Sequence, residues 1–581
     1  MANVMRKPID KGAYFILTII CLSLILAGGF FEFVSSLVTM PLLVFLLYKM
    51  QKEKKLKLPY DINLLSIAVF VSSYLIVSLW AIDSGMAIWG FFKFLPVLLF
   101  FILVCQQEED REWLIDLLPI VGSIMTLVTF ALMQIEEFRS WVSVAGRLAG
   151  TFQYPNTYGL FVLVCLILSI YKIQKKKILP WFNTAIAAFG IYVSGSRAIM
   201  ALTIGILILI LFDKLKLKKR WLFVPTFLGI SSVGAVLLYS QRNLYFQEIL
   251  LWNLSTFLGR LLYYVDAIPV ILRNPFGLGY YGYFLIRPSI QSGVYTVLNV
   301  HNEFLQIALD VGIGVAILFY VCILKSLIQY KNMAKENTVE NKGSRNAFVL
   351  LCILLHSLFD FDFQFISILF ILVLFLKLEN FKDFKVSTFT RVGTCIMSFL
   401  IIAVTTIIGL SSFFFVQRDF HQAIEIYNWN TLARIEQLDN AQTIQEIEIL
   451  GKGIMESTDR VSLAHSALSR AAFMRGDISS FIAYQEEAIR LGPYQFHEYL
   501  VYLDGLVRAM DIFIELGDID SAQRVLDYAL RIPELLDEVR ERTHPLGWLI
   551  VDEPQVELPD EYIEKLEDAR LRLEAEIGRH E

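Results

Sequence analysis

The sequence contains few charged residues, few histidines and no clustered cysteines. Charged residues make up 18% of its 581 residues, whereas hydrophobic residues make up 56%. No single water-exposed domain could bury so large an apolar fraction, so the composition excludes an ordinary soluble protein. The six cysteines lack CxxC or Cys/His spacing, and the seven histidines are scattered. We therefore predict neither a metal site nor a cofactor.

Long apolar runs divide the first 415 residues. The first run, residues 12–31, is long enough to cross ~30 Å of hydrocarbon and lacks a signal-peptide cleavage site, so we expect it to be retained. Further runs are centred near Val44, Val71, Val97, Leu127, Phe161, Ala187, Ile206, Ile230, Ile317, Cys352, Ile371 and Ile402. These runs predict an all-α, polytopic membrane protein with about thirteen spans, in which residues 1–415 form the transmembrane domain.

The connectors at residues 49–57, 172–177, 213–220, 331–345 and 377–385 are rich in lysine. All five fall on the same side when the spans alternate from a cytoplasmic N-terminus, as the excess of lysine and arginine in cytoplasmic loops requires. This orientation in a bacterial cytoplasmic membrane places an external loop at residues 241–300 and the whole segment 416–581 outside the cytoplasm.

Residues 416–581 differ in composition from the rest of the chain. They include 33 acidic and 16 basic residues, whereas the first 415 residues include 23 acidic and 35 basic ones. The sequence around Gly476 is echoed around Gly517, a period of roughly 40 that is near the ~34 of tetratricopeptide (TPR) repeats. We predict an extracytoplasmic TPR-like helical domain, capped by a helix from Asp560, whose concave face could bind a protein partner. A nucleic-acid partner is not expected for so acidic a segment.

Two arginines lie at the predicted outer ends of spans. Arg197, in VSGSRAIM, would cost ~2.5 to 3.5 kcal/mol inside a membrane, so it is expected to face a cavity or a partner unless it snorkels to the headgroups. Arg147, in GRLAGTFQYPN, precedes a predicted helix start at Asn156. The free N–H groups there suit a phosphate, although capping by Asn156 explains the same residues.

Two further candidate arginines lie in the external loop. Arg260 opens an amphipathic stretch that ends at NPFGLGYYGYF, and its planar fork suits two phosphate oxygens. Arg273 stands beside the NP turn, where simple solvation is the alternative.

Histidine and aspartate residues mark the start and the end of later spans. His301, in VHNEFLQ, can accept a proton near neutral pH, because an unperturbed imidazole has a pKa of ~6.5. A helix-capping role for His301 is the alternative. In LLHSLFDFDFQF, Asp360 and Asp362 could hold a divalent cation with a diphosphate if the segment is irregular. A polar loop that ends the span is the favoured interpretation.

The order RLAGTFQYPN, SGSRA, Arg260, NPFGLGYYGYF, HNEFLQIALDVG and HSLFDFDF resembles the bacterial O-antigen ligase and Wzy-type polymerase superfamily. The resemblance covers roughly residues 140–380. It implies a metal-independent glycosyltransferase that takes glycan from undecaprenyl diphosphate at the outer face of the cytoplasmic membrane. Arg197 and Arg260 would then hold the diphosphate and His301 would activate the acceptor hydroxyl. Arg147, Arg273 and Asn302 are predicted to bind substrate.

Several functions remain open at this point. Polymerisation and ligation would use the same residues, and the C-terminal helices make transfer to a protein, as in a protein O-oligosaccharyltransferase, a third possibility. A transporter of lipid-linked glycan or an inactive scaffold is the non-enzymatic alternative. A transporter more typically shows inverted repeats and charged, broken helices at the membrane midplane, which the sequence does not display.

Overall fold

The computed structural model describes residues 9–174, 177–215, 244–335, 342–550 and 552–580, and nearly all of them are helical. It confirms the predicted all-α, polytopic membrane protein. Within these residues, seven helices are long and apolar enough to cross a membrane, and four shorter apolar helices accompany them. The expected span near Ile230 lies outside the described residues.

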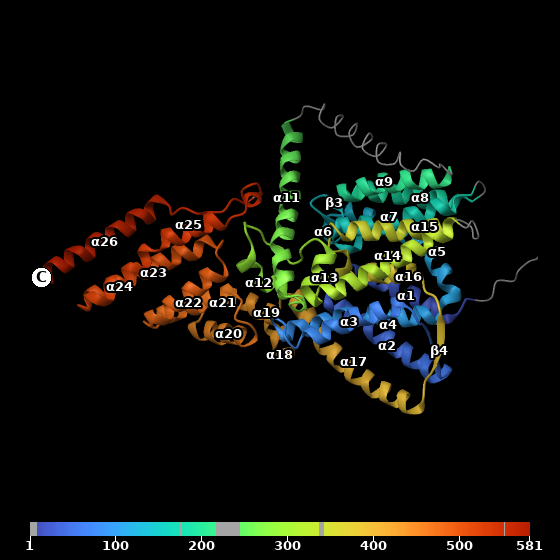
Figure 1. Ribbon diagram of the computed structural model, residues 1–581, viewed down its shortest axis with the longest axis horizontal. Helices are drawn as coiled ribbons and strands as arrows, with labels where there is room; N and C mark the ends of the chain where they lie inside the picture. The colour runs from blue at the N-terminus through green and yellow to red at the C-terminus, as the bar shows by residue number, and fades with distance from the viewer. Residues whose placement is uncertain (1–8, 175–176, 216–243, 336–341, 551, 581) are drawn as a thin grey trace, which may run out of the picture.

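A bundle of roughly parallel helices forms the larger part of the molecule (Figure 1). Its helices are α1 (Lys11–Ile25), α2 (Glu32–Glu53), α3 (Ile62–Val77), α4 (Ser84–Gln106), α5 (Arg111–Met133), α7 (Pro155–Lys172), α8 (Ile178–Ser194), α9 (Arg197–Lys214), α13 (Glu303–Val311), α14 (Ile313–Lys335), α15 (Lys342–Ser357), α16 (Ile366–Phe375) and α17 (Thr388–Val416).

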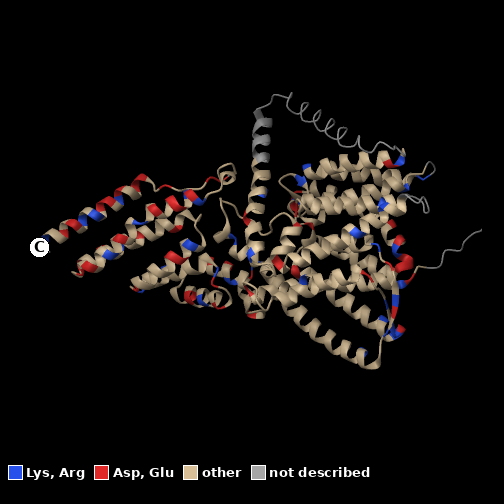
Figure 2. Ribbon diagram, viewed as in Figure 1, with Lys and Arg blue, Asp and Glu red and all other residues tan. Residues whose placement is uncertain are grey.

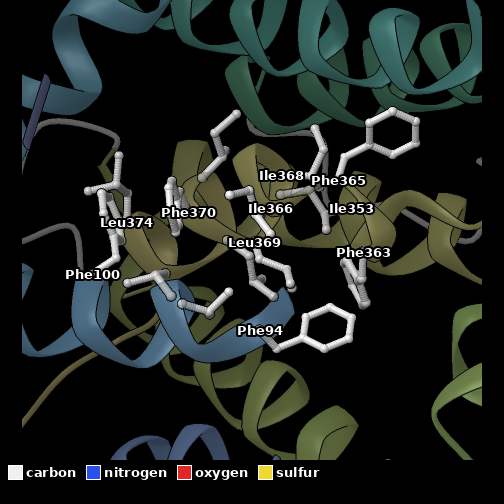
Figure 3. Packing of buried hydrophobic residues seen from close by; sticks show 14 of the residues in the cluster. Phe94, Phe100, Ile353, Phe363, Phe365, Ile366, Ile368, Leu369, Phe370 and Leu374 are labelled. Carbon is white, nitrogen blue, oxygen red and sulfur yellow. The ribbon is translucent and has the colours of Figure 1, made fainter. Parts of the chain in front are cut away.

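The centre of this bundle is α16, whose ten residues are all buried. Figure 3 shows its side chains meeting those of α4 and α15, and Phe370 stacks on Phe100 with ring centroids 4.1 Å apart. Ten residues span only about 15 Å at 1.5 Å per residue, about half of a ~30 Å hydrocarbon layer. The non-helical segment before α16 therefore enters the bundle, where protein rather than lipid must satisfy its backbone.

One end of the bundle, which we call the strand end, gathers the described parts of the lysine-rich connectors. Strand β1 (Lys55–Pro59) pairs antiparallel with β4 (Phe381–Lys385). Close by, Lys57 forms an ion pair of 2.6 Å with Glu108. Further connectors make contacts of their own: Lys172 with Asp116, Lys214 with the Ile170 carbonyl, and Arg345 with Glu112. Charges are sparse between the two ends of the bundle (Figure 2).

Helix α11 (Leu244–Arg273) crosses the opposite end of the bundle nearly at right angles to the other helices (Figure 1). We call this the site end. Residues 255–273 are apolar enough for a span by composition, yet the helix lies across the bundle rather than along it. One side of α11 is buried, with Leu262, Ala267 and Ile271, while Ile268 and Leu272 remain exposed. The predicted external loop is therefore largely one helix, followed by α12 (Gly282–Ile290).

The C-terminal helices extend from the site end (Figure 1). They are α18 (Phe420–Ile426), α19 (Thr431–Asp439), α20 (Ile444–Ser457), α21 (Ser462–Met474), α22 (Ile478–Leu491), α23 (Phe496–Glu515), α24 (Ile519–Leu530), α25 (Ile532–Arg542) and α26 (Asp560–His580). Short elements complete the fold: α6 (Glu136–Val142), β2 (Ser143–Val144), β3 (Arg147–Leu148), the 3-10 turn Asp362–Gln364 and the 3-10 turn Pro545–Trp548.

The sequence echo corresponds to two helical hairpins, α21–α22 and α23–α24. Gly476 and Gly517 occupy the same place in the two turns, with φ of 76° and 72°, which favours glycine. The next residue in each, Asp477 or Asp518, caps the second helix of its hairpin. Helix α26 packs against α23 and α24, as expected of the capping helix. Membership of the TPR class and a domain boundary near residue 416 stay predictions.

Candidate active site

Two of the glycine-containing motifs form a single structural unit at the site end. In NPFGLG, the amides of Leu278 and Gly279 donate to the carbonyls of Leu309 and Asp310 at 2.7 and 2.9 Å, so the turn docks on the end of α13. Gly277 has φ of 88°, and a Cβ there would lie 2.5 Å from the Asp310 carbonyl oxygen. Only glycine fits this approach, which positions α13 and the residues before it.

His301 lies just before α13, and its backbone conformation is fixed by neighbouring residues. Its φ is 54°, a left-handed conformation that is uncommon outside glycine. The Tyr264 hydroxyl of α11 donates to the His301 carbonyl at 2.8 Å. Asn302 caps α13 by accepting from the Leu305 amide, and its NH2 group donates to the Leu358 carbonyl at 2.9 Å. Asn302 therefore fixes the backbone beside His301, whose side chain is 20% exposed.

Asp360 connects His301 to the rest of the site. Its Oδ1 lies 3.2 Å from Nδ1 of His301 and accepts from the Tyr154 hydroxyl at 2.8 Å, while Oδ2 accepts from Asn156 at 2.7 Å. Burial alone would raise the pKa of Asp360, but the hydrogen bond and charge of His301 together with the charge of Arg260 lower it well below its usual range. A buried carboxylate is thus kept ionised against the imidazole, as in other histidine–carboxylate pairs.

Arg260 approaches the same carboxylate from α11. Its Nη2 lies 3.6 Å from Oδ2 of Asp360, and its Nη1 donates to the Phe359 carbonyl at 2.6 Å. Burial would lower the pKa of Arg260, but the Asp360 carboxylate raises it. The side chain is 20% exposed, and a guanidinium has five N–H donors, so Arg260 can bind a further anion without leaving Asp360.

Arg147 and Arg197 lie on the neighbouring side of Asp360. Arg147 donates to the Asn156 side chain at 3.0 Å and to the Ser194 carbonyl at 2.9 Å. Its pKa is lowered by burial and by the positive charges of Arg197 and Arg260, so each of these two guanidinium groups lies within electrostatic range of Arg147. Arg197 is the exposed first residue of α9. In the part of the chain described, Asp360 is the carboxylate that forms an ion pair with this group.

Arg273 is not brought to this group. It is exposed at the last turn of α11, and thirteen residues at 1.5 Å each separate it from Arg260 by about 20 Å along the helix.

The two aspartates of the DFD segment, Asp360 and Asp362, contact different partners. Asp362 accepts from Thr157 at 2.9 Å and lies 2.5 Å from Nδ1 of buried His356, whereas Asp360 faces His301 and Asn156. A shared cation is therefore not supported by their geometry. Across the described ranges, no group of three or more His, Cys, Asp or Glu side chains converges as metal ligands would.

Sequence reasoning missed the roles of Asp360, Tyr154 and Asn156. The sequence predicts Asp360 only as a metal ligand or a loop residue, and Asn156 only as a helix cap. In the structure Tyr154 precedes α7, and Asn156 bridges Arg147 and Asp360 instead of capping. The available signal in the sequence was a polar residue beside a basic cluster. Its pairing with a residue 59 positions away, as between His301 and Asp360, was not visible in the sequence.

The fold and site define a class: a polytopic membrane protein with a basic, histidine-containing site at one end of its helix bundle. Residues 182–320 match the family model for O-antigen ligase. A comparison with curated proteins gave no match. The matched region contains Arg197, Arg260 and His301 but excludes Arg147 and Asp360. The match supports a membrane glycan ligase or polymerase in general.

Proposed function

We propose that this protein transfers a glycan from undecaprenyl diphosphate to an acceptor hydroxyl, without a metal ion, at the outer face of the cytoplasmic membrane. The observation that supports this proposal best is the convergence of three arginines around a histidine–aspartate pair. The family match supports glycan transfer, while the donor, the orientation and the acceptor are our inference.

The arginines suit the donor side of the reaction. Arg197 and Arg260 both lie within electrostatic range of Arg147, and one carboxylate, Asp360, forms an ion pair in this group. Because like charges repel, an anion bound among these guanidinium groups would stabilise the site. A diphosphate brings at least two negative charges and several acceptor oxygens that match guanidinium forks. As the bond from the anomeric carbon to the diphosphate oxygen breaks, its electron pair moves to that oxygen. Fixed cations stabilise this charge more in the transition state than in the ground state.

His301 and Asp360 suit the acceptor side. With Nδ1–H donating to Asp360, the lone pair of Nε2 is available to take a proton. The acceptor oxygen then bonds to the anomeric carbon while its proton passes to Nε2, so His301 is the proposed general base. Asp360 acts through His301, orienting the ring and stabilising the imidazolium that forms. We call Asp360 a positioning residue for this reason.

Reconstituted transfer tests this function. Purified protein in liposomes is supplied with undecaprenyl-diphosphate-linked glycan and EDTA, and the lipid-linked pool and larger products are followed by gel. We expect donor consumption in the wild type and loss of at least about a hundredfold in His301→Ala, because general-base catalysis typically contributes about 10²–10⁴-fold. A similar loss is expected in Arg260→Ala, because removing one donor to a developing negative charge typically costs about 10²–10³-fold.

The products distinguish the possible reactions. A ladder formed from donor alone indicates polymerisation, whereas a single transfer that requires an added lipid, glycan or protein indicates ligation. Intact donor that changes leaflet indicates transport and refutes the transferase. Normal transfer by both variants refutes the site assignment.

A further inference from the structure

A second pocket opens at the site end, between the start of α4 and the C-terminal helices. It encloses about 730 Å³, including its open mouth. Among the residues that line it are Asp83, Asn428, Trp429, Arg434 and Glu456. The transfer mechanism above uses none of these side chains.

Trp429 contributes a large apolar side chain to the lining of this pocket. It is 59% exposed although the turn that carries it is firmly held. On one side the Tyr427 hydroxyl donates to the Gly85 carbonyl at 2.9 Å, and on the other Asn430 donates to Ser411 at 3.0 Å while capping α19. A tryptophan held in place but left exposed offers rigid contact area with little entropy to lose on binding.

The polar side chains of the pocket are also preorganised. Arg434, 8% exposed, donates to the Gly453 carbonyl and to the Asn428 side-chain oxygen, the latter at 2.7 Å. Asp83, 1% exposed, caps α4 through the Met86 amide and accepts from the Thr431 hydroxyl. Glu456 is exposed at the wall of the pocket. The wall therefore offers carboxylate acceptors and amide or guanidinium donors side by side.

This composition selects one ligand chemistry. The wall carries two carboxylates, Asp83 and Glu456, and one guanidinium, Arg434, which already donates hydrogen bonds within the protein. Its net charge is therefore neutral to negative, which disfavours a diphosphate. Sugar hydroxyls both donate and accept hydrogen bonds, and the C–H face of a pyranose ring is apolar. A flat indole beside mixed donors and acceptors is complementary to such a ring.

The pocket is coupled to the active site by one turn. The Ile82 amide, next to Asp83, donates to the Leu278 carbonyl at 2.9 Å, and the same NPFGLG turn docks on α13. Helix α13 has nine residues, about 14 Å at 1.5 Å per residue, between this contact and His301. A ligand in the pocket would thus lie beyond the reach of a single sugar bound at His301.

We propose that this pocket is a second glycan-binding site, which holds an uncharged sugar several residues away from the reacting end of an oligosaccharide. Its contribution to transfer rests on the proposed function, but its binding of glycan does not.

The test uses the full chain in lipid nanodiscs, because maltoside detergents would present sugar headgroups to the pocket. An array of neutral bacterial surface oligosaccharides is probed first, and the best tetrasaccharide or longer glycan is then titrated by calorimetry. We expect Trp429→Ala to weaken binding at least tenfold and Glu456→Gln to weaken it less. The matched control is Trp181→Ala, since Trp181 is similarly exposed, at 55%, but lies on α8 outside the pocket.

The outcomes separate this proposal from the transfer function. Binding that persists in His301→Ala and falls in Trp429→Ala supports the second site whether or not transfer is observed. In a working transfer assay, Trp429→Ala should raise KM for a long acceptor and leave kcat with a monosaccharide acceptor unchanged. The proposal is overturned if no arrayed glycan binds or if Trp429→Ala binds as the wild type does. A peptide that binds in competition at this pocket would replace the glycan as its ligand and also overturn it.

Discussion

Replacing Asp360 by asparagine removes one negative charge while preserving the size of the side chain. The new NH2 group replaces one of the two carboxylate oxygens. In place of Oδ1 it would face the donors of Tyr154 and His301, and in place of Oδ2 it would face the donor of Asn156. Asn156 cannot turn its oxygen towards the new NH2 group without withdrawing it from Arg147. No single rotation of the two amides satisfies every partner.

The expected effect on transfer follows from the contacts that are lost. A hydrogen bond to a charged group contributes about 1.5–3 kcal/mol, and each 1.36 kcal/mol in the barrier changes the rate tenfold. Weakening the hold of Asp360 on His301 should therefore slow transfer by about 10- to 150-fold. The loss should approach the upper value, because Arg260 loses the same carboxylate 3.6 Å away.

The assay is reconstituted transfer with Asp360→Asn, His301→Ala and the double variant. If Asp360 acts mainly through His301, Asp360→Asn should slow the His301→Ala variant far less than it slows the wild type, because only the contact with Arg260 then remains to be lost. Losses that multiply in the double variant would refute this reasoning, as would an Asp360→Asn enzyme within threefold of the wild type. Protein levels and unfolding temperature serve as controls for folding.

Three further predictions concern charge, glycine and pH. Arg260→Lys should lose most transfer, because lysine keeps the charge but not the fork, whereas Arg273→Ala should stay within threefold of the wild type in the same assay. Gly277→Ala should lower the unfolding temperature through strain of about 1–3 kcal/mol and slow transfer, while Gly314→Ala, where an added Cβ meets nothing within 4 Å, should do neither. The pKa of Asp360 is lower in the folded protein than in the unfolded chain, where it is about 3.9. The ionised carboxylate therefore stabilises the fold at pH values above about 3.9. This contribution is lost as the pH falls from about 3.9 through the lowered pKa of the folded state. Thermal unfolding should accordingly show a smaller deficit for Asp360→Asn at pH 3 than at pH 5. A deficit that grows on acidification would contradict this sign.

Local sequence patterns determined the class of the fold and much of its layout. Apolar runs predict spans because the hydrocarbon thickness sets their length, and lysine-rich connectors indicate one common end because charge is costly inside a membrane. The described connectors do meet at the strand end, where β1 pairs with β4. The candidate residues were likewise identifiable, because Arg197 and His301 stand at the edges of apolar runs and Arg260 opens an amphipathic stretch of the predicted external loop.

Only the tertiary structure decided which of these residues act together. The sequence predicts an external loop at residues 241–300, and packing lays its helix α11 across the site end, where Arg260 reaches Asp360 and Arg273 does not. The partner of Asp360 at Asn156 is 204 residues distant in the chain. Such contacts depend on how whole helices pack. They also depend on the shortness of α16, because the loop before it, which carries Asp360, then lies inside the bundle. Periodicity and charge describe a segment and its surroundings, so they carry no information about which distant side chain will complete a site.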